Sequence, residues 1–224
     1  DLQAGDIVTV VDSRNNILGT GFAEAGNIAV KILTFDNRKI DSNFWKERLA
    51  KAFELRKLMG LTDNEHINCY RLVHSEGDNL PGLIIDIYGK TAVVQAQTEG
   101  MALNVKAIAD ALMTIEGLNI TSVYNKSSEA MQRMGKDAVE DGYLIGESSD
   151  EFVLENDSKF FVDWEEGQKT GFFLDQRFNR DLVRQLAKGK NVLNTFCYTG
   201  GFSVTALRGG ANKVVSVDCS KKAI

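Results

Sequence analysis

The sequence predicts a multidomain protein of mixed α/β and α+β class, and three observations predict it. Residues 1–41 alternate short apolar runs with glycine-containing turns, which is typical of a small β-barrel. Residues 62–165 contain strand-like runs around one amphipathic helix, which is typical of an α+β domain. Residues 166–224 follow the order helix, strand, Gly-Gly turn, helix, strand, which opens a parallel, doubly wound sheet.

A helix is expected to join the first two segments. In the first segment, "DIVTVVD" and "NILGTGF" flank the polar turn "SRNN", and "NIAVKILTFD" follows. Ser42 or Asn43 can then cap a helix that ends at Gly60. Its apolar face comprises Trp45, Leu49, Ala52 and Phe53. We therefore expect residues 42–61 to form a linker helix between a partial barrel and the central domain.

The central segment is expected to form an antiparallel sheet covered by a helix. The runs "LIIDIY" and "AVVQAQ" are strand patterns joined by Gly89 and Lys90, and "ITSVYNK" is a further strand. The run "EFVLENDSKFFVDW" is typical of a hairpin that turns at Asn156 and Asp157. A helix is expected over residues 102–116, with one face formed by Val105, Ile108, Leu112 and Ile115.

The third segment contains the motif that indicates a ligand, "VLNTFCYTGGFSVTAL". It follows a helix pattern that carries Phe178, Leu182 and Leu186 and ends at Gly189. In the motif, a buried strand leads to Gly200 and Gly201, which admit a ligand close to the backbone because they lack a Cβ. The next helix N-terminus offers free N–H groups.

The next strand of this segment ends at Asp218, where a carboxylate can accept hydrogen bonds from both hydroxyls of a ribose. A nucleoside-containing ligand is therefore favoured. Tyr198 stands where a dinucleotide-binding fingerprint would have its first glycine, which favours S-adenosylmethionine (SAM) over a dinucleotide. A glycine turn that serves packing alone is the alternative.

Composition limits the other classes of function. The 224 residues contain no run of about 18 apolar residues, so no membrane span is expected. The three cysteines lack CxxC spacing, which favours a reducing cytoplasm and neither a disulfide framework nor a zinc site. With only two histidines, no other metal site is expected. The net charge of −5 means that a nucleic-acid partner needs a local basic face.

Two long motifs, "GQKTGFFLDQRFNR" and "VLNTFCYTGGFSVTALRGGANKVVSVDCSKKAI", closely resemble the RlmI-like family of ribosomal RNA methyltransferases. The stretch "YRLVHSEGDNLPGLIIDIYG" resembles the same family, so the resemblance covers essentially the whole chain. It implies a PUA-type RNA-binding barrel, a central α+β domain and the N-terminal part of a Rossmann-like methyltransferase domain. It also implies SAM as cofactor and carbon 5 of a cytosine in large-subunit ribosomal RNA as target.

The resemblance assigns cofactor-binding roles around the glycine turn. Asn194 ends the first strand, where class I enzymes usually have an acidic residue, and its amide can bind the methionine amine. Asp218 would bind the ribose, with Cys219 and Ser220 beside the adenine. The methionine side of the pocket would be lined by Phe196, Tyr198, Thr199, Gly200 and Gly201.

The segment before the first strand is implied to reach the cofactor as well. Gln176, in "LDQRFNR", is the candidate there, with Lys169 and Thr170 nearby. Arg177 has two open interpretations, a role at the cofactor or an internal salt bridge.

Three further features have a functional and a structural interpretation. Cys197 could be a nucleophile that attacks pyrimidine carbon 6, but its place in the glycine turn favours packing. His74 could act as an acid or base with Glu76 and Asp78, and a turn histidine is the alternative. A set of basic residues could contact phosphates, and a solvated helix face explains most of them equally well: Lys169, Arg177, Arg180, Arg184, Lys188 and Lys190.

The resemblance also implies that no catalytic residue lies in this chain. In the family, a loop with an acidic residue and two prolines follows the fourth strand, and the catalytic cysteine comes later, whereas Pro81 is the only proline here. The chain opens at Asp1 inside a strand pattern and stops at Ile224 just after another strand. We therefore expect a chain cut at both ends, inactive alone, weak in SAM binding, and prone to dimerise through exposed apolar faces.

Two other functions stay open at this point. One is a non-catalytic RNA-binding or ribosome-assembly module built on the barrel and the central domain. The other is a nucleotide-dependent oxidoreductase, against which the bulky Tyr198 argues. Ribosomal RNA is the expected partner of a methyltransferase or an assembly module.

Overall fold

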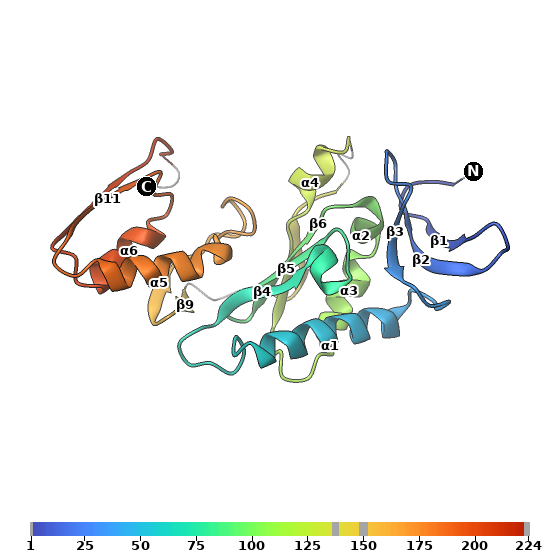
Figure 1. Ribbon diagram of the computed structural model, residues 1–224, viewed down its shortest axis with the longest axis horizontal. Helices are drawn as coiled ribbons and strands as arrows, with labels where there is room; N and C mark the ends of the chain where they lie inside the picture. The colour runs from blue at the N-terminus through green and yellow to red at the C-terminus, as the bar shows by residue number, and fades with distance from the viewer. Residues whose placement is uncertain (1, 136–138, 148–151, 222–224) are drawn as a thin grey trace.

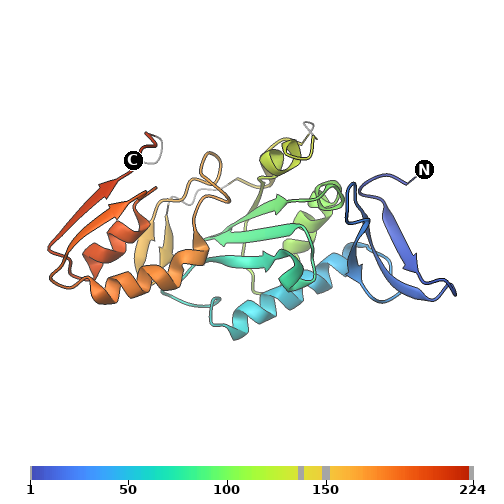
Figure 2. The ribbon, with the colours of Figure 1, turned by 45° about the horizontal axis from the view of Figure 1, so that its top comes forward.

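The computed structural model describes residues 2–135, 139–147 and 152–221, and its elements form three groups along the long axis (Figures 1 and 2). The two ends of the sequence, Asp1 and Ile224, and Glu151 of the expected hairpin lie outside the described residues. The N-terminal strands lie at one end, a five-stranded sheet lies in the middle, and a two-stranded parallel sheet with two helices lies at the other end.

The N-terminal group is an antiparallel sheet in the order β1-β2-β3. Its strands are β1 (Ile7–Val11), β2 (Ile17–Ala23) and β3 (Val30–Thr34). They match the three strand patterns of this segment, which confirms the strand predictions. The sheet is joined to the next helix by an aromatic contact, in which the rings of Phe22 and Trp45 stack with centroids 6.4 Å apart.

Helix α1 (Ser42–Leu58) packs on the central sheet. The four residues predicted to form its apolar face are buried. The predicted cap at Ser42 or Asn43 is wrong, because Asp41 caps the helix and its Oδ1 accepts the Phe44 N–H at 3.0 Å. Asp41 has extended backbone angles, whereas Ser42 is already helical. The domain limits expected at residues 41, 61 and 165 stay predictions.

The central sheet has the order β4-β5-β6-β7-β8, and its β6–β7 pair is parallel. The prediction of an antiparallel sheet is therefore wrong, because a helical crossover between β6 and β7 brings these strands side by side in the same direction. The strands are β4 (Cys69–His74), β5 (Leu83–Tyr88), β6 (Thr91–Ala96), β7 (Ser122–Asn125) and β8 (Gly142–Ile145). The first and last of them were not expected from the sequence.

The crossover contains two helices where the sequence predicted one over residues 102–116. They are α2 (Glu99–Leu103) and α3 (Val105–Leu112), and α4 (Ser128–Gln132) follows β7. The break falls at Asn104, whose side-chain amide donates to the Gly100 carbonyl at 2.8 Å. Such a local side-chain bond competes with continuation of the helix. Ile115 lies beyond α3 but is buried, as expected.

The two faces of the central sheet support different parts of the molecule. One face packs on α1 and α3 through a core that includes Leu72, Ile85, Val94 and Ile108. The other face packs on the segment that leads to the C-terminal group, through a core that includes Tyr88, Val93, Phe160, Trp164 and Phe172. The second face therefore positions the residues that precede the glycine turn.

The predicted hairpin is present as β9 (Val153–Glu155) and β10 (Ser158–Phe160), which form a two-stranded sheet of their own. Asn156 and Asp157 have φ values of 49° and 62°, the left-handed conformation expected of this turn. The turn is attached to the loop before β4, because the His66 Nδ1 and the Asp157 Oδ1 lie 2.5 Å apart.

We expect the contact between His66 and Asp157 to stabilise the fold slightly more at low pH. The hydrogen bond to Asp157, helped by its charge, raises the pKa of His66 above the usual value of about 6.5. This stabilisation is complete below the unfolded pKa and is lost as the pH rises through the folded pKa. Thermal unfolding between about pH 5 and 9 should show a midpoint difference between wild type and His66→Gln that shrinks with rising pH. A difference that is constant with pH would contradict this.

The C-terminal group confirms the parallel pairing predicted for it. Strand β11 (Asn191–Thr195) pairs in parallel with β12 (Lys213–Val217), and α6 (Gly201–Arg208) connects them. Helix α5 (Arg177–Leu186) precedes β11, after the short η2 (Leu174–Gln176). Both helices lie on one side of the two-stranded sheet (Figure 2).

The expectation of a buried first strand in this group is wrong. Leu193 on β11 is 66% exposed, because β12 is the only strand beside β11 within the described residues and one face of the pair is uncovered. The apolar residues predicted for α5 are exposed too, with Phe178 at 84%. The residues that α5 buries are Arg177 and Arg180.

Candidate functional site

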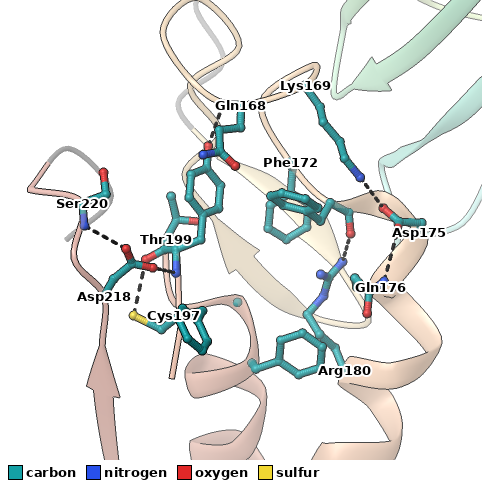
Figure 3. A pocket seen from close by; sticks show the side chains of 15 residues that line it. Gln168, Lys169, Phe172, Asp175, Gln176, Arg180, Cys197, Thr199, Asp218 and Ser220 are labelled. Carbon is teal, nitrogen blue, oxygen red and sulfur yellow. Dashed lines mark hydrogen bonds and ion pairs between the residues drawn. The ribbon is translucent and has the colours of Figure 1, made fainter. Parts of the chain in front are cut away.

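A cavity of about 570 Å³ lies where the glycine turn after β11 meets the segment that precedes α5 (Figure 3). It is at the carboxyl ends of two parallel strands, where ligands bind in sheets of this type. Its volume suits a ligand of nucleoside size. It is lined by Gln168, Lys169, Phe172, Phe173, Asp175, Gln176, Arg180, Phe196, Cys197, Tyr198, Thr199, Gly201, Phe202, Asp218 and Ser220.

The turn has an unusual backbone. Phe196, Tyr198 and Gly200 have φ values of 57°, 50° and 81°, so left-handed residues alternate with ordinary ones. Each aromatic residue in this conformation stores roughly 1 kcal/mol or more of strain, and such strain persists where the surroundings enforce it. Here the Cys197 N–H donates to the Val217 carbonyl at 3.2 Å, which attaches the turn to β12.

Asp218 is the second support of the turn and one of the four charged residues that line the pocket. Its Oδ2 accepts the Tyr198 N–H at 2.8 Å and its Oδ1 accepts the Ser220 N–H at 2.9 Å. The N–H groups of Ser220 and Tyr198 lower the pKa of Asp218 below its usual value. A carboxylate has about four acceptor positions, so both oxygens can also accept hydrogen bonds from hydroxyls of a ligand.

The opposite wall of the pocket is tied to the turn by Tyr198. The Tyr198 hydroxyl accepts the Gln168 N–H at 3.0 Å, and its ring meets the edge of Phe173 with centroids 5.4 Å apart. The Lys169 Nζ lies 4.3 Å from the Phe173 ring centroid and 3.5 Å from Asp175 Oδ1. These contacts give the pocket aromatic walls with a polar rim (Figure 3).

Arg180 forms the floor of the pocket and is held by a buried carboxylate. Its guanidinium binds both oxygens of Glu155, at 2.6 and 2.7 Å, and lies 4.4 Å from the Phe172 ring centroid. Arg177 pairs with the same Glu155 at 3.3 Å and donates to the Cys69 carbonyl. Arg177 does not line the cavity. Of its two open interpretations, the structure shows the salt bridge.

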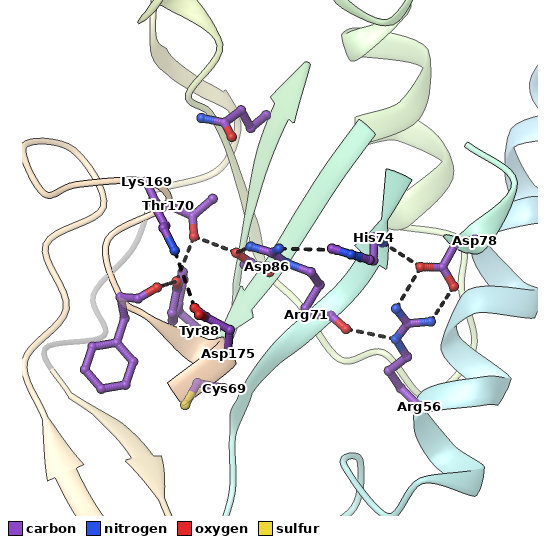
Figure 4. A network of polar contacts seen from close by, with 12 residues as sticks. Arg56, Cys69, Arg71, His74, Asp78, Asp86, Tyr88, Lys169, Thr170 and Asp175 are labelled. Atoms are coloured by element: carbon purple, nitrogen blue, oxygen red, sulfur yellow. Dashed lines mark hydrogen bonds and ion pairs between the residues drawn. The ribbon is translucent and has the colours of Figure 1, made fainter. Parts of the chain in front are cut away.

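The structure brings most of the predicted site residues together at this cavity. Those that line it are Lys169, Gln176, Phe196, Tyr198, Thr199, Gly201, Asp218 and Ser220. Gly200 caps α6 beside the cavity. Asn194 lies outside the lining and donates to the Ser203 hydroxyl at 2.9 Å. Thr170 is buried outside the pocket, where it donates to Asp86 Oδ2 at 2.6 Å (Figure 4).

Sequence reasoning missed several lining residues. Gln168, Phe172, Phe173 and Phe202 were not singled out as contacts, and Arg180 was considered only as part of a basic face. The pair of phenylalanines in "TGFFLD" was the available signal, because ligand pockets are lined mainly by apolar and aromatic side chains.

The structure also shows what surrounds Cys197, His74 and the basic residues, for which the sequence left two interpretations. Cys197 is buried in the turn. The His74 ring nitrogen lies 3.4 Å from Arg71, whereas Asp78 is bound by both terminal nitrogens of Arg56 (Figure 4). The imidazole of His74 thus lies beside Arg71, and it is the backbone N–H of His74 that donates to Asp78 Oδ2, at 2.5 Å. Four of the basic residues have acidic partners: Lys169, Arg177, Arg180 and Arg184.

Two other kinds of site were sought among the described residues. They contain no group of three or more His, Cys, Asp or Glu side chains that could hold a metal ion. No helix in the described part of the chain is long and apolar enough to cross a membrane.

Comparison with known proteins decides the family. A family model for S-adenosylmethionine-dependent methyltransferases matches residues 71–224. The chain belongs to this methyltransferase family. A PUA-like domain model matches residues 1–35 of the chain. The predicted family and fold class are thereby confirmed, and neither an oxidoreductase nor a non-catalytic module is favoured.

The chain is similar in sequence to ribosomal RNA methyltransferases. It is 40% identical to a candidate large-subunit ribosomal RNA methyltransferase of Methanocaldococcus jannaschii, over 100% of this chain and 55% of the relative. It is 38% identical to the ribosomal RNA large subunit methyltransferase I of Tolumonas auensis, over 99% of this chain and 56% of the relative. The chain thus spans slightly more than half the length of these relatives.

Solved structures show the same fold. A candidate SAM-dependent methyltransferase of Streptococcus mutans superposes with a TM-score of 0.82 at 27% identity, over 99% of this chain and 57% of that one. A candidate methyltransferase crystallised with S-adenosylhomocysteine (SAH) superposes with a TM-score of 0.83 at 27% identity, over 99% and 56% of the two chains.

Proposed function

We propose that the cavity binds SAM and that the protein methylates large-subunit ribosomal RNA. The observation that carries the proposal is Asp218, a carboxylate at the end of β12 that faces an aromatic-walled cavity across the glycine turn. The names of the relatives and the PUA-like match support an RNA substrate. When bound, SAM supplies an electrophilic methyl group on a sulfonium.

The pocket fits the chemical groups of SAM. Asp218 would accept hydrogen bonds from the ribose hydroxyls, with Ser220 next to the adenine. The aromatic walls suit the adenine ring and the positively charged sulfonium, since both are attracted to the faces of aromatic rings. The start of α6 at Gly201 presents free N–H groups to the methionine carboxylate.

The proposed target is carbon 5 of a cytosine, which rests on the resemblance to the RlmI-like family. This reaction needs a thiolate that adds to carbon 6 of the base. Burial raises the pKa of Cys69 to about 12, and Cys197 is enclosed in the cofactor turn. Neither of these thiols suits the role, and the resemblance places the third cysteine, the exposed Cys219, beside the adenine. We therefore propose that the polypeptide 1–224 by itself does not methylate RNA, and also that it binds SAM weakly.

Two measurements test this proposal. Calorimetric titration of the natural full-length protein should show that SAH binds and that NADH does not. Nucleoside analysis by mass spectrometry should show less 5-methylcytidine in large-subunit ribosomal RNA from cells that lack the gene. Loss of a different methylated nucleoside would overturn the target and keep the methyltransferase. Binding of NADH in place of SAH would overturn the cofactor.

A further inference from the structure

Lys126 directly follows β7, on the central sheet. Its ammonium group binds a loop that is distant in sequence, residues 164–167. Its Nζ donates to the backbone carbonyls of Trp164, Glu165 and Gly167, the last two at 3.1 and 2.8 Å. A lysine ammonium has three donors, so these bonds use all of them. The residue is only 9% exposed.

The loop bound by Lys126 continues directly into the wall of the cofactor pocket. Gly167 precedes Gln168 and Lys169, which both line the cavity, and the Gln168 N–H donates to the Tyr198 hydroxyl. The loop is tightly folded at this point, because a Cβ at Gly167 would lie 2.1 Å from the Asp163 carbonyl oxygen. A shift of the Gly167 carbonyl would therefore move the contact to Tyr198.

Burial of an ammonium group away from water disfavours its charged form. Desolvation lowers the pKa of Lys126, although Asp141, Asp163, Glu166 and Glu129 oppose the shift. An apolar side chain would avoid this penalty. The three carbonyls that the ammonium binds are thus the evident reason for a lysine at this position.

We propose that Lys126 is a positioning residue of the cofactor site, which fixes the backbone of residues 164–167 so that the pocket wall keeps its place. A second attachment lies on the other side of Lys169, where Thr170 binds Asp86 and the Tyr88 hydroxyl (Figure 4). Contacts with the central sheet, through Lys126 and Thr170, therefore hold the chain on both sides of Gln168 and Lys169. The inference rests on the proposed function, since it assumes that the cavity binds SAM.

The test compares three lysine variants in the natural full-length protein. Lys126→Met keeps the length of the side chain without donors and should weaken SAH binding by about tenfold or more, since hydrogen bonds to a charged group are lost. Lys126→Arg retains several donors and should bind SAH within about threefold of wild type. Lys106→Met, at an exposed lysine of α3, is the matched control and should leave SAH affinity unchanged.

A second readout reports on the loop itself. Lys169 is a trypsin site within the loop, so Lys126→Met should be cleaved there faster than wild type. Ile108→Val, in the core of the opposite sheet face, should lower the unfolding temperature without changing SAH affinity or cleavage at Lys169. This control separates loop position from general stability.

The outcomes distinguish this inference from the proposed function. If wild type binds SAH and Lys126→Met binds it equally with unchanged cleavage, the inference is overturned and the proposed function stands. If wild type does not bind SAH, the proposed function fails. If Lys126→Met does not fold, Lys126→Gln replaces it, since its shorter side chain has two donors and cannot bind all three carbonyls. Wild-type affinity and unchanged cleavage at Lys169 in that variant overturn the inference.

Discussion

Replacement of Asp218 by alanine should lower the SAH affinity of the pocket by at least about 100-fold. The substitution removes the acceptor for two ribose hydroxyls, and hydrogen bonds to a charged group contribute about 1.5–3 kcal/mol each. It also removes the carboxylate that holds Tyr198 and Ser220 through their backbone N–H groups. Calorimetric titration of the full-length protein with SAH measures the effect. Asp110→Ala, at an exposed carboxylate of α3, is the control and should bind like wild type.

The charge of Asp218 also predicts how the SAH affinity responds to pH. Backbone N–H groups, first that of Ser220 and then that of Tyr198, lower the pKa of Asp218 below its usual value of about 3.9. The carboxylate therefore stays ionised throughout mild acid, and SAH affinity should be constant between about pH 5 and 8. Asp218→Asn should bind more weakly than wild type over that whole range. A wild-type affinity that falls near pH 6, or an alanine variant that binds normally, would show that Asp218 is not the ribose acceptor.

Local patterns in the sequence predicted those parts of the fold that local interactions determine. The turn at Asn156 and Asp157 follows from the left-handed preference of these residues, and the apolar face of α1 follows from helical spacing. The parallel order around the Gly-Gly turn follows from the same kind of local pattern, and a cavity lies beside this turn and Asp218. In each case the residues that determine the structure are near each other in the chain.

The parts that could not be predicted depend on charges with distant partners. Strand β4 carries Arg71, whose charge argues against a buried strand until Asp86 on β5 is seen to bind it at 2.8 and 2.9 Å. Thr170 was predicted to contact the cofactor, whereas its hydroxyl donates a hydrogen bond to Asp86. Helix α5 looked as if it would bury its apolar residues and instead buries two arginines. No spacing within α5 indicates that Glu155 lies beside it.

Glu155 is therefore the residue at which we expect the largest effect on stability. Its side chain is 1% exposed and forms ion pairs with Arg177 and Arg180. Glu155→Ala leaves two guanidinium groups buried without a counter-charge, and loss of one partner from a buried ion pair typically costs about 3–5 kcal/mol. For a protein of this size the unfolding temperature should fall by roughly 6–20 °C. Thermal and urea unfolding measure this loss.

The matched control is Glu129→Ala, because Glu129 pairs with Arg133 on an exposed helix, with side chains 68% and 75% exposed. That pair should contribute less than about 0.5 kcal/mol, so the same substitution should hardly change the unfolding temperature. Glu155→Ala should also weaken SAH binding, because Arg180 contacts Phe172 in the pocket. If Glu155→Ala destabilises the protein no more than Glu129→Ala, the buried cluster does not hold β9, β4 and α5 together. A stable Glu155→Ala variant with weakened SAH binding would instead assign Glu155 to the orientation of Arg180 in the pocket.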